Sequence, residues 1–339
     1  MKTNPVISVN NLGFPWETQD PFLFCVHHED FYPKGNDDLG PLDDLKGRNL
    51  GSDFTIKDGY RMYHGQKVPG FPAHPHRGFE TVTIVRKGLV DHADSTGASG
   101  RFGNGDVQWM TAGKGVQHSE MFPLLNKKDE NPFELFQIWI NLPKANKFVE
   151  PHFKMLWNED LKIEKFEDAK GGKSEISIVT GKISESGPTP PPDSWAADLK
   201  NNVAIWNIKM DANAEITLPN AEGVINRNLY FFKGEQISIE DQNIEVYKGI
   251  ELNAGISTTI KNGNKPAHLL LLQGKPIGEP VVKYGPFVMN TDEEVQQAMN
   301  DFQNTQFGGW PWPKRDQVHD ELKGRFAKHS DGRLEDKNK

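Results

Sequence analysis

Two stretches of the sequence, HPHRGFETVT at residues 74–83 and GDVQWMTAGKGVQHSEM at residues 105–121, decide the expected fold. Each stretch contains two side chains of the kinds that bind metals, spaced two positions apart. Residues with this spacing lie on one face of an extended strand. The segment between them is rich in glycine, and glycine-rich turns join strands into hairpins. We therefore expect adjacent antiparallel strands that direct imidazoles and a carboxylate toward one interior.

The rest of the chain also has the pattern of a β-protein. Short β-branched and aromatic runs alternate with turn signals, and the 339 residues include 32 glycines and 23 prolines. Many short strands at near-regular spacing are typical of sandwiches and barrels. A helical period appears only late, where Thr291 is an N-cap candidate before an apolar stripe that includes Val295, Ala298 and Phe302. We predict an all-β chain with one short C-terminal helix.

Composition excludes several functional classes. The 39 Lys and Arg against 47 Asp and Glu give a net charge of −8, which provides no general attraction to nucleic acid or an anionic membrane. A single cysteine, Cys25, permits neither an intrachain disulfide nor a cysteine-based zinc finger. No secretory signal and no membrane-spanning apolar run is recognisable. We expect a cytoplasmic protein without direct nucleic-acid or membrane contact.

The length suggests about two domains. We place the first at residues 1–150 and the second at residues 151–312, because a mixed stretch with helical character separates the two β-regions near residue 150. Residues 313–339 are mostly charged or small and polar, so we expect an exposed tail there. A proline-rich insert at residues 188–200 lies inside the second β-region.

The candidate ligands are His74 and His76 in the first stretch and His118 and Glu120 in the second. A single His-X-His is weak evidence for a metal, but two such pairs joined by a glycine-rich segment favour a metal site. Glu80 is an alternative, since it shares the strand parity of His76 unless Gly78 interrupts it. Glu80 could serve as a ligand, or as a hydrogen-bond acceptor that orients a ligand histidine.

Nitrogen and oxygen ligands without thiolate suit Fe, Mn, Ni, Co, Cu or Zn. Four such ligands would close a tetrahedral structural zinc site. On an octahedral iron they would leave two positions open for a substrate and dioxygen, as in other non-haem iron sites. Because a chain of this length does not need a metal in order to fold, we favour the open site.

Both stretches resemble the signature of the pirin family, as do HADS at residues 92–95, GEPVV at 278–282 and GPFVMNT at 285–291. The resemblance implies a bicupin, with two cupin barrels of the double-stranded β-helix type and a metal in the first barrel only. It also implies that His74, His76, His118 and Glu120 are the ligands. By that resemblance Glu80 is not one of them.

For several pirins the resemblance implies iron(II) and a quercetin-type dioxygenase activity. The substrates would be a flavonol-like small aromatic molecule and dioxygen. The flavonol hydroxyl would lose its proton at the metal, Glu120 could accept that proton as a catalytic residue, and ring cleavage would release carbon monoxide. The alternative is an iron-dependent regulatory protein that binds a transcription factor or a metabolic enzyme without catalysis. Pirin-like chains are often monomeric, and we expect a monomer.

Overall fold

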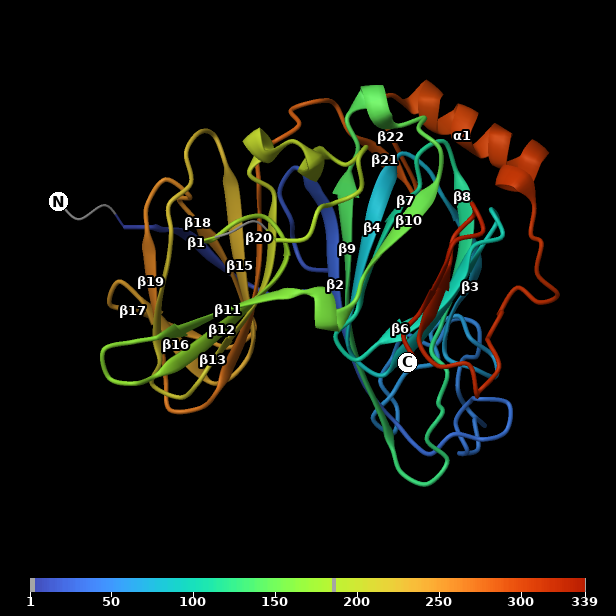
Figure 1. Cartoon of the computed structure of the whole chain (residues 1–339), viewed down its shortest axis with the longest axis horizontal. Coiled ribbons are helices and arrows are strands. Elements are labelled where there is room, and N and C mark those ends of the chain that lie inside the picture. The colour runs from blue at the N-terminus through green and yellow to red at the C-terminus, as the bar shows by residue number, and fades with distance from the viewer. Residues whose placement is uncertain (1–3, 185–186, 339) are drawn as a thin grey trace. The chain divides into compact units, whose positions relative to one another are not determined.

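The structure of the chain is a computed structural model that describes residues 4–184 and 187–338, and strands dominate it (Figure 1). It divides into two compact units. The histidine unit, which carries both histidine pairs, consists of residues 27–137, 142–158 and the chain from Glu279 onward. The second unit consists of the chain up to Val26 and residues 138–141 and 159–278.

The histidine unit is built from two large sheets around one apolar core. Val85 and Met110 enter this core from one sheet, and Val90 and Phe102 enter it from the other. The five-stranded sheet has the order β10 (His152–Leu156), β7 (Val107–Thr111), β4 (Phe79–Lys87), β9 (Asn131–Asn141), β2 (Phe22–Tyr32). The six-stranded sheet has the order β24 (Leu334–Asp336), β23 (Phe326–Lys328), β6 (Ser99–Gly103), β5 (Leu89–Asp94), β8 (Val116–Met121), β3 (Gly70–His76).

The second unit repeats this plan with a more apolar interior. Its core consists of buried aliphatic and aromatic side chains from both sheets, among them Trp206, Leu229 and Ile260. The seven-stranded sheet has the order β1 (Val6–Asn11), β18 (Lys248–Leu252), β15 (Asn226–Lys233), β20 (Ala267–Gly274), β13 (Ala204–Met210), β12 (Lys173–Thr180), β11 (Lys162–Glu167). The four-stranded sheet has the order β14 (Glu215–Leu218), β19 (Thr258–Asn262), β16 (Gln236–Ile239), β17 (Gln242–Glu245).

Helical structure is limited, as the sequence predicts. The hairpin of β21 (Val282–Tyr284) and β22 (Phe287–Met289) leads to the one α-helix of the described residues, α1 (Asp292–Thr305). The Thr291 side chain accepts a hydrogen bond from the Glu294 backbone N–H, which confirms the predicted N-cap. The remaining helices are single 3-10 turns: η1 (Lys144–Asn146), η2 (Asn158–Asp160), η3 (Trp195–Ala197), η4 (Leu199–Asn201) and η5 (Gln306–Gly308).

The two units are not the consecutive segments 1–150 and 151–312 expected from the sequence. The N-terminal strand β1 pairs with β18 of the second unit, and the chain after Glu279 returns to the histidine unit. Residues 313–339 do not form the exposed tail that we expected, because β23 pairs with β6 and β24 pairs with β23. Such long-range pairing leaves no local sequence signal, since neither partner strand lies near the other in the chain.

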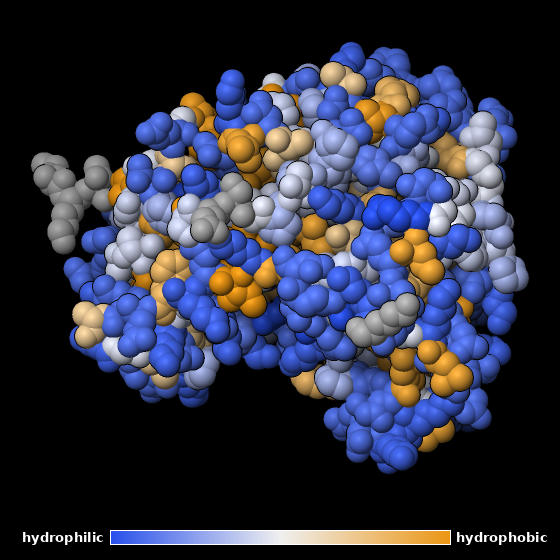
Figure 2. All heavy atoms as spheres, viewed as in Figure 1, coloured by the Kyte–Doolittle hydropathy of each residue, from blue (hydrophilic) through white to orange (hydrophobic). Residues whose placement is uncertain are grey.

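The surface agrees with the acidic, hydrophilic composition. Figure 2 shows a face that is mostly hydrophilic, with hydrophobic residues in small separate groups. Among the residues that the structure describes, no helix is long and apolar enough to cross a membrane.

A buried ion pair attaches the C-terminal segment to the six-stranded sheet. The guanidinium of Arg101 donates to both carboxylate oxygens of Asp91, at 2.6 and 2.8 Å, and both side chains are fully buried. The same guanidinium donates to the backbone carbonyls of His319, Asp320 and Lys323. Arg101 therefore joins two strands and the returning chain in one network.

Substitution of Arg101 should reveal this attachment. We expect Arg101→Ala to lower the free energy of unfolding by about 3–5 kcal/mol, because it leaves Asp91 charged, buried and without its partner. Arg333→Ala, which removes an exposed pair with Glu335, should cost less than about 1 kcal/mol and serves as the control. Urea denaturation curves measure both; equal losses in the two variants would contradict the network.

Candidate metal centre

The two histidine pairs lie on neighbouring antiparallel strands. In the pairing of β3 with β8, His74 faces His118 and Phe71 faces Glu120, with an irregularity in register between Phe71 and His74. β3 is an edge strand, and such a position tolerates Pro75, which cannot donate to a sheet ladder. The expected arrangement of the two stretches on adjacent antiparallel strands is thus present.

Three imidazoles form a compact cluster. The ligand atoms of His74, His76 and His118 all lie within 4.8 Å of one another. The ring centroids are 4.5 Å apart for His74 and His118, and 4.9 Å apart for His76 and His118. Among the histidine, cysteine and carboxylate side chains of the described residues, these three imidazoles form the group that could hold a metal ion.

Hydrogen bonding and burial prepare the imidazoles as ligands. The Nδ1 of His74 lies 2.9 Å from the Pro72 carbonyl oxygen, so it carries the proton and leaves Nε2 as the free donor atom. Burial lowers the pKa of His74 to about 4, and burial with the neighbouring imidazoles lowers the pKa values of His76 and His118 far below their usual range. All three rings are therefore neutral at pH 7, as metal ligands must be.

His118 is the most deeply enclosed of the three. Its side chain is 0% exposed, and neither ring nitrogen has a hydrogen-bond partner among the described residues. A buried polar atom without a partner is costly in a folded protein, and a metal ion would satisfy one of the two nitrogens. The donor set of the cluster thus fits a bound divalent metal.

Glu120 lies beside the cluster rather than within it. Its Oε2 is 3.7 Å from Nε2 of His118, which is close enough for both to contact one ion. Thr83 Oγ1 and Gln137 Nε2 donate hydrogen bonds of 3.0 Å to its two carboxylate oxygens. Burial raises the pKa of Glu120, although these hydrogen bonds oppose that effect.

Glu80, the alternative carboxylate, is in a different place. Gly78 adopts a φ of +87° between the end of β3 and the start of β4, which breaks the strand parity. Glu80 therefore lies in the five-stranded sheet, fully buried, where its Oε1 accepts a 2.8 Å hydrogen bond from Thr111. It is not part of the histidine cluster.

A fourth histidine stands next to the cluster. In the pairing of β5 with β8, His92 faces Glu120 and Asp94 faces His118, so these side chains occupy the same side of the sheet. The His92 ring is 5.6 Å from that of His118 and lies 3.1 Å from Asp94 through its Nε2. The register thus places His92 and Asp94 against the strand that carries His118 and Glu120.

Arg77, next to His76, forms an ion pair with α1. Its Nη1 lies 2.6 Å from Oδ2 of Asp301 on α1, and its Nε donates to the Lys114 carbonyl. The guanidinium also lies 4.6 Å from the centre of the Phe307 ring. Arg77 thereby fixes α1 against the turn that follows His76.

A returning segment, the strap of residues 306–315, holds both ligand strands. Gln117 donates to two backbone carbonyls of the strap, at 2.6 and 3.2 Å. The Ala73 backbone N–H, directly before His74, donates to the Arg315 carbonyl, and the Trp312 indole donates to a carbonyl of β5. The Trp-Pro-Trp-Pro stretch at residues 310–313 thus packs on the barrel, and these contacts link the strap to each strand that carries a candidate ligand.

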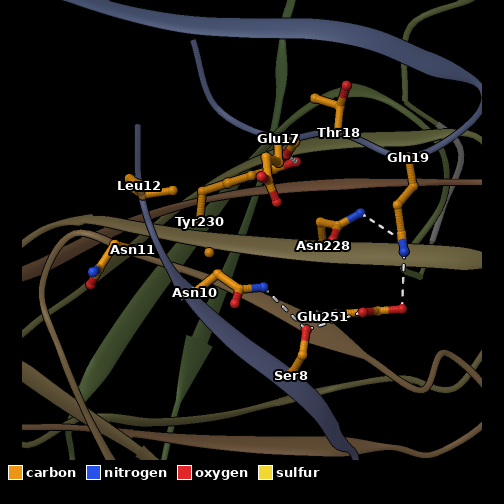
Figure 3. Close-up of a pocket in the computed structure, with 11 residues that line it drawn as sticks. Ser8, Asn10, Asn11, Leu12, Glu17, Thr18, Gln19, Asn228, Tyr230 and Glu251 are labelled. Carbon is orange, nitrogen blue, oxygen red and sulfur yellow. Dashed lines mark hydrogen bonds between the residues drawn. The ribbon is translucent and has the colours of Figure 1, made fainter. Parts of the chain in front are cut away.

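The second unit contains a polar cleft on the outer face of its seven-stranded sheet (Figure 3). Its carboxylate Glu251 accepts hydrogen bonds from Ser8 and Gln19, and Asn228 donates to the same glutamine. These side chains bond to one another, so the cleft offers no group of metal ligands comparable to the histidine cluster. The prediction of a metal only in the first barrel remains a prediction.

Comparisons with known proteins agree with the fold and the sequence signature. The Pirin family profile matches residues 17–140, and the profile of the pirin C-terminal cupin domain matches residues 205–308. Human Pirin is 34% identical over 257 residues, which cover 73% of this chain and 80% of the human protein. A Pseudomonas aeruginosa protein named provisionally as a quercetin 2,3-dioxygenase is 34% identical over 243 residues, covering 71% of this chain and 80% of the relative.

A solved structure extends the likeness over nearly the whole chain. The crystal structure of quercetin 2,3-dioxygenase from Acinetobacter baumannii superimposes with a TM-score of 0.70 and 25% identity, covering 90% of this chain and 99% of that one. The fold is therefore the bicupin expected from the sequence, with strands throughout and one short C-terminal helix. With its two family profiles and relatives matched over four-fifths of their length, this chain belongs to the pirin family.

Proposed function

We propose that this pirin is an iron(II)-dependent dioxygenase that cleaves flavonols of the quercetin type, with one metal per chain in the histidine unit. The observation that carries the proposal is the cluster of three neutral imidazoles beside a buried carboxylate. His74 is only half-buried, whereas the other ligand candidates are almost fully enclosed, so the cluster approaches the surface on one side. The names of the dioxygenase relatives support the same reaction class.

In this proposal, His74, His76 and His118 hold the metal through ring nitrogens, and Glu120 contributes a carboxylate oxygen. Such a nitrogen and oxygen donor set suits iron(II), and Mn, Ni, Co, Cu and Zn are accepted by the same donors. When bound, the metal would supply Lewis acidity toward a phenolic hydroxyl and redox chemistry toward dioxygen.

The protein's own contribution is to place the proton acceptor. Hydrogen bonds from Thr83 and Gln137 hold the Glu120 carboxylate next to His118, and burial raises its pKa toward the range useful for a general base. When it is detached from the metal, Glu120 would accept the proton of the flavonol hydroxyl, which leaves the substrate electron-rich for reaction with dioxygen.

The second candidate is an iron-dependent regulatory protein that binds a transcription factor or a metabolic enzyme. The observation that favours it is the deep burial of His118, His76 and Glu120, which are 0%, 3% and 5% exposed. A change from iron(II) to iron(III) would add one charge in this enclosed site, and the strap lies against both ligand strands. For either candidate we place the protein in the cytoplasm as a monomer.

Removal of one imidazole should abolish metal binding. We expect His118→Ala to purify with far less than one iron per chain after anaerobic reloading, because only two imidazoles then remain. His268→Ala, a histidine of the second unit, is the matched control and should retain the wild-type metal content. Elemental analysis measures both; equal iron in the two variants would show that the cluster is not the binding site.

Metal binding should release few protons at pH 6. Ordinary imidazoles are partly protonated there, but the folded-state pKa of His74 near 4 and the lowered values of its neighbours leave these rings already neutral. We expect about one proton at most, from Glu120, whose pKa is raised. Calorimetric titration with zinc in two buffers of different ionisation enthalpy counts the protons; release of two or more would contradict the neutral cluster.

The same pKa shift has a consequence for stability without metal. Because the unfolded chain binds a proton at His74 near pH 6.5 and the folded chain only near pH 4, the metal-free protein should lose stability as the pH falls through this window. Denaturation of the metal-free protein between pH 7 and pH 4 measures the effect. His74→Gln should have a shallower pH dependence, and identical slopes would refute this assignment.

Iron-loaded protein should consume dioxygen and release carbon monoxide when quercetin is added. Glu120→Gln, assayed at full iron occupancy, should lower kcat by about 100-fold, because amide oxygen is a poor proton acceptor. Glu80→Gln, which changes a buried carboxylate outside the histidine cluster, should keep the wild-type iron content and a similar kcat. Full iron occupancy without any turnover of quercetin would reject the dioxygenase in favour of the regulatory protein.

A further inference from the structure

One buried charged side chain of the second unit, Arg227, has no carboxylate to pair with it among the described residues. Leu229 and Phe231 of β15 belong to the apolar core, and Arg227 shares their strand parity, so its side chain also enters the interior. Arg227 is 1% exposed. It is a charged side chain on the same side of the strand as residues of the apolar core.

The neighbours of Arg227 satisfy only part of the guanidinium. Its Nε donates a 2.6 Å hydrogen bond to Oε1 of Gln273, and the Gln273 amide in turn donates to the Asn202 carbonyl. Nη1 is buried without a hydrogen-bond partner, and within residues 4–184 and 187–338 no carboxylate pairs with Arg227. Burial lowers the Arg227 pKa to about 10, which still leaves the group charged at neutral pH.

An uncompensated buried charge is expensive, and native proteins pair such groups with a counter-charge. A buried polar atom without a partner commonly marks the position of an ion or a water molecule. Water could satisfy the Nη1 hydrogen bond but would not compensate the charge. The position next to Arg227 is therefore suited to an anion.

A second unsatisfied donor lies in the neighbouring layer of the same interior. Residues that face one another across β15, β20 and β13 form rows of the sheet. One row consists of Arg227, Gln273 and Ala204. The next row consists of Leu229, Leu271 and Trp206. The Trp206 indole N–H is buried and has no acceptor among the described residues. Two N–H donors without acceptors thus occur in adjacent rows, on strands β15 and β13 that flank β20 (Figure 1).

We propose that the second barrel binds a small organic monocarboxylate, whose carboxylate contacts the guanidinium of Arg227 and accepts from the Trp206 indole. A planar carboxylate matches the fork of a guanidinium, and its single negative charge equals the single positive charge present. A phosphate dianion would remain undercompensated in an apolar interior. The organic part of the ligand would contact Leu229 and Leu271, which occupy the next row of the same interior.

This site is separate from the cleft of Figure 3. Asn228 and Tyr230, which line that cleft, alternate along β15 with Arg227 and Leu229 and therefore lie on the outer face of the sheet. The proposed carboxylate site and the histidine cluster also belong to different units. The inference is therefore independent of the proposed dioxygenase activity.

The test is calorimetric titration of the full-length, metal-loaded protein with sodium benzoate and sodium acetate, with sodium chloride at equal ionic strength as the reference. We expect saturable binding of benzoate at about one per chain, in keeping with one unpaired guanidinium. Arg227→Met should lose this binding, and Arg333→Met, an exposed arginine of the histidine unit, should keep it. His118→Ala, which lacks the proposed metal site, should also keep benzoate binding. This control distinguishes binding at Arg227 from binding of the carboxylate to the metal.

Two conservative variants keep the test decisive if Arg227→Met does not fold. Arg227→Lys retains the charge without the planar fork, and Trp206→Phe retains the ring without the N–H donor. Each should weaken benzoate binding by about tenfold, the effect of one hydrogen bond to a charged group. Binding that is unchanged in these variants, or a benzoate response no larger than that of chloride, would overturn the proposal.

Discussion

The pairing of β3 with β8 is the constraint on which the candidate centre depends. Because His74 lies opposite His118, two imidazoles from separate parts of the sequence become neighbours, and the two-residue period of a strand adds His76 and Glu120 on the same side. A shift of one residue in this register would turn the ligand side chains away from the interior. The glycine-rich hairpins between the two stretches and the strap that contacts both strands each restrict such a shift.

Burial then determines the chemistry of these side chains. Burial disfavours imidazolium, so the histidines are neutral at physiological pH, as metal binding requires, while the same burial makes the Glu120 carboxylate a stronger base. An enclosed cluster of this kind gains stability from a metal ion that satisfies its nitrogen atoms. The same principle underlies the anion that we propose next to Arg227 in the second barrel.

Local sequence patterns predicted the features that depend on neighbouring residues. The strand parity of His74 and His76 and the N-cap at Thr291 both follow from a few consecutive positions. The choice between Glu80 and Glu120 needed the family resemblance, because parity across Gly78 cannot be decided without knowing its backbone conformation. The pairing of β23 with β6 was missed for another reason: about 220 residues separate the partners, and nothing local records such a contact. The sequence could also have predicted that Arg227 enters the interior, because Arg227 and Leu229 lie two positions apart in one strand.

The central claim is that three imidazoles and the Glu120 carboxylate hold one iron at which a flavonol reacts. X-ray absorption at the iron edge, recorded on anaerobically loaded protein before and after addition of quercetin, tests it most directly. The account predicts a first shell of nitrogen and oxygen atoms with the multiple-scattering pattern of three imidazoles, and a change in that shell when quercetin is present. A first shell without imidazoles would contradict the assignment of the site, and a spectrum that quercetin leaves unchanged would contradict the proposed reaction there.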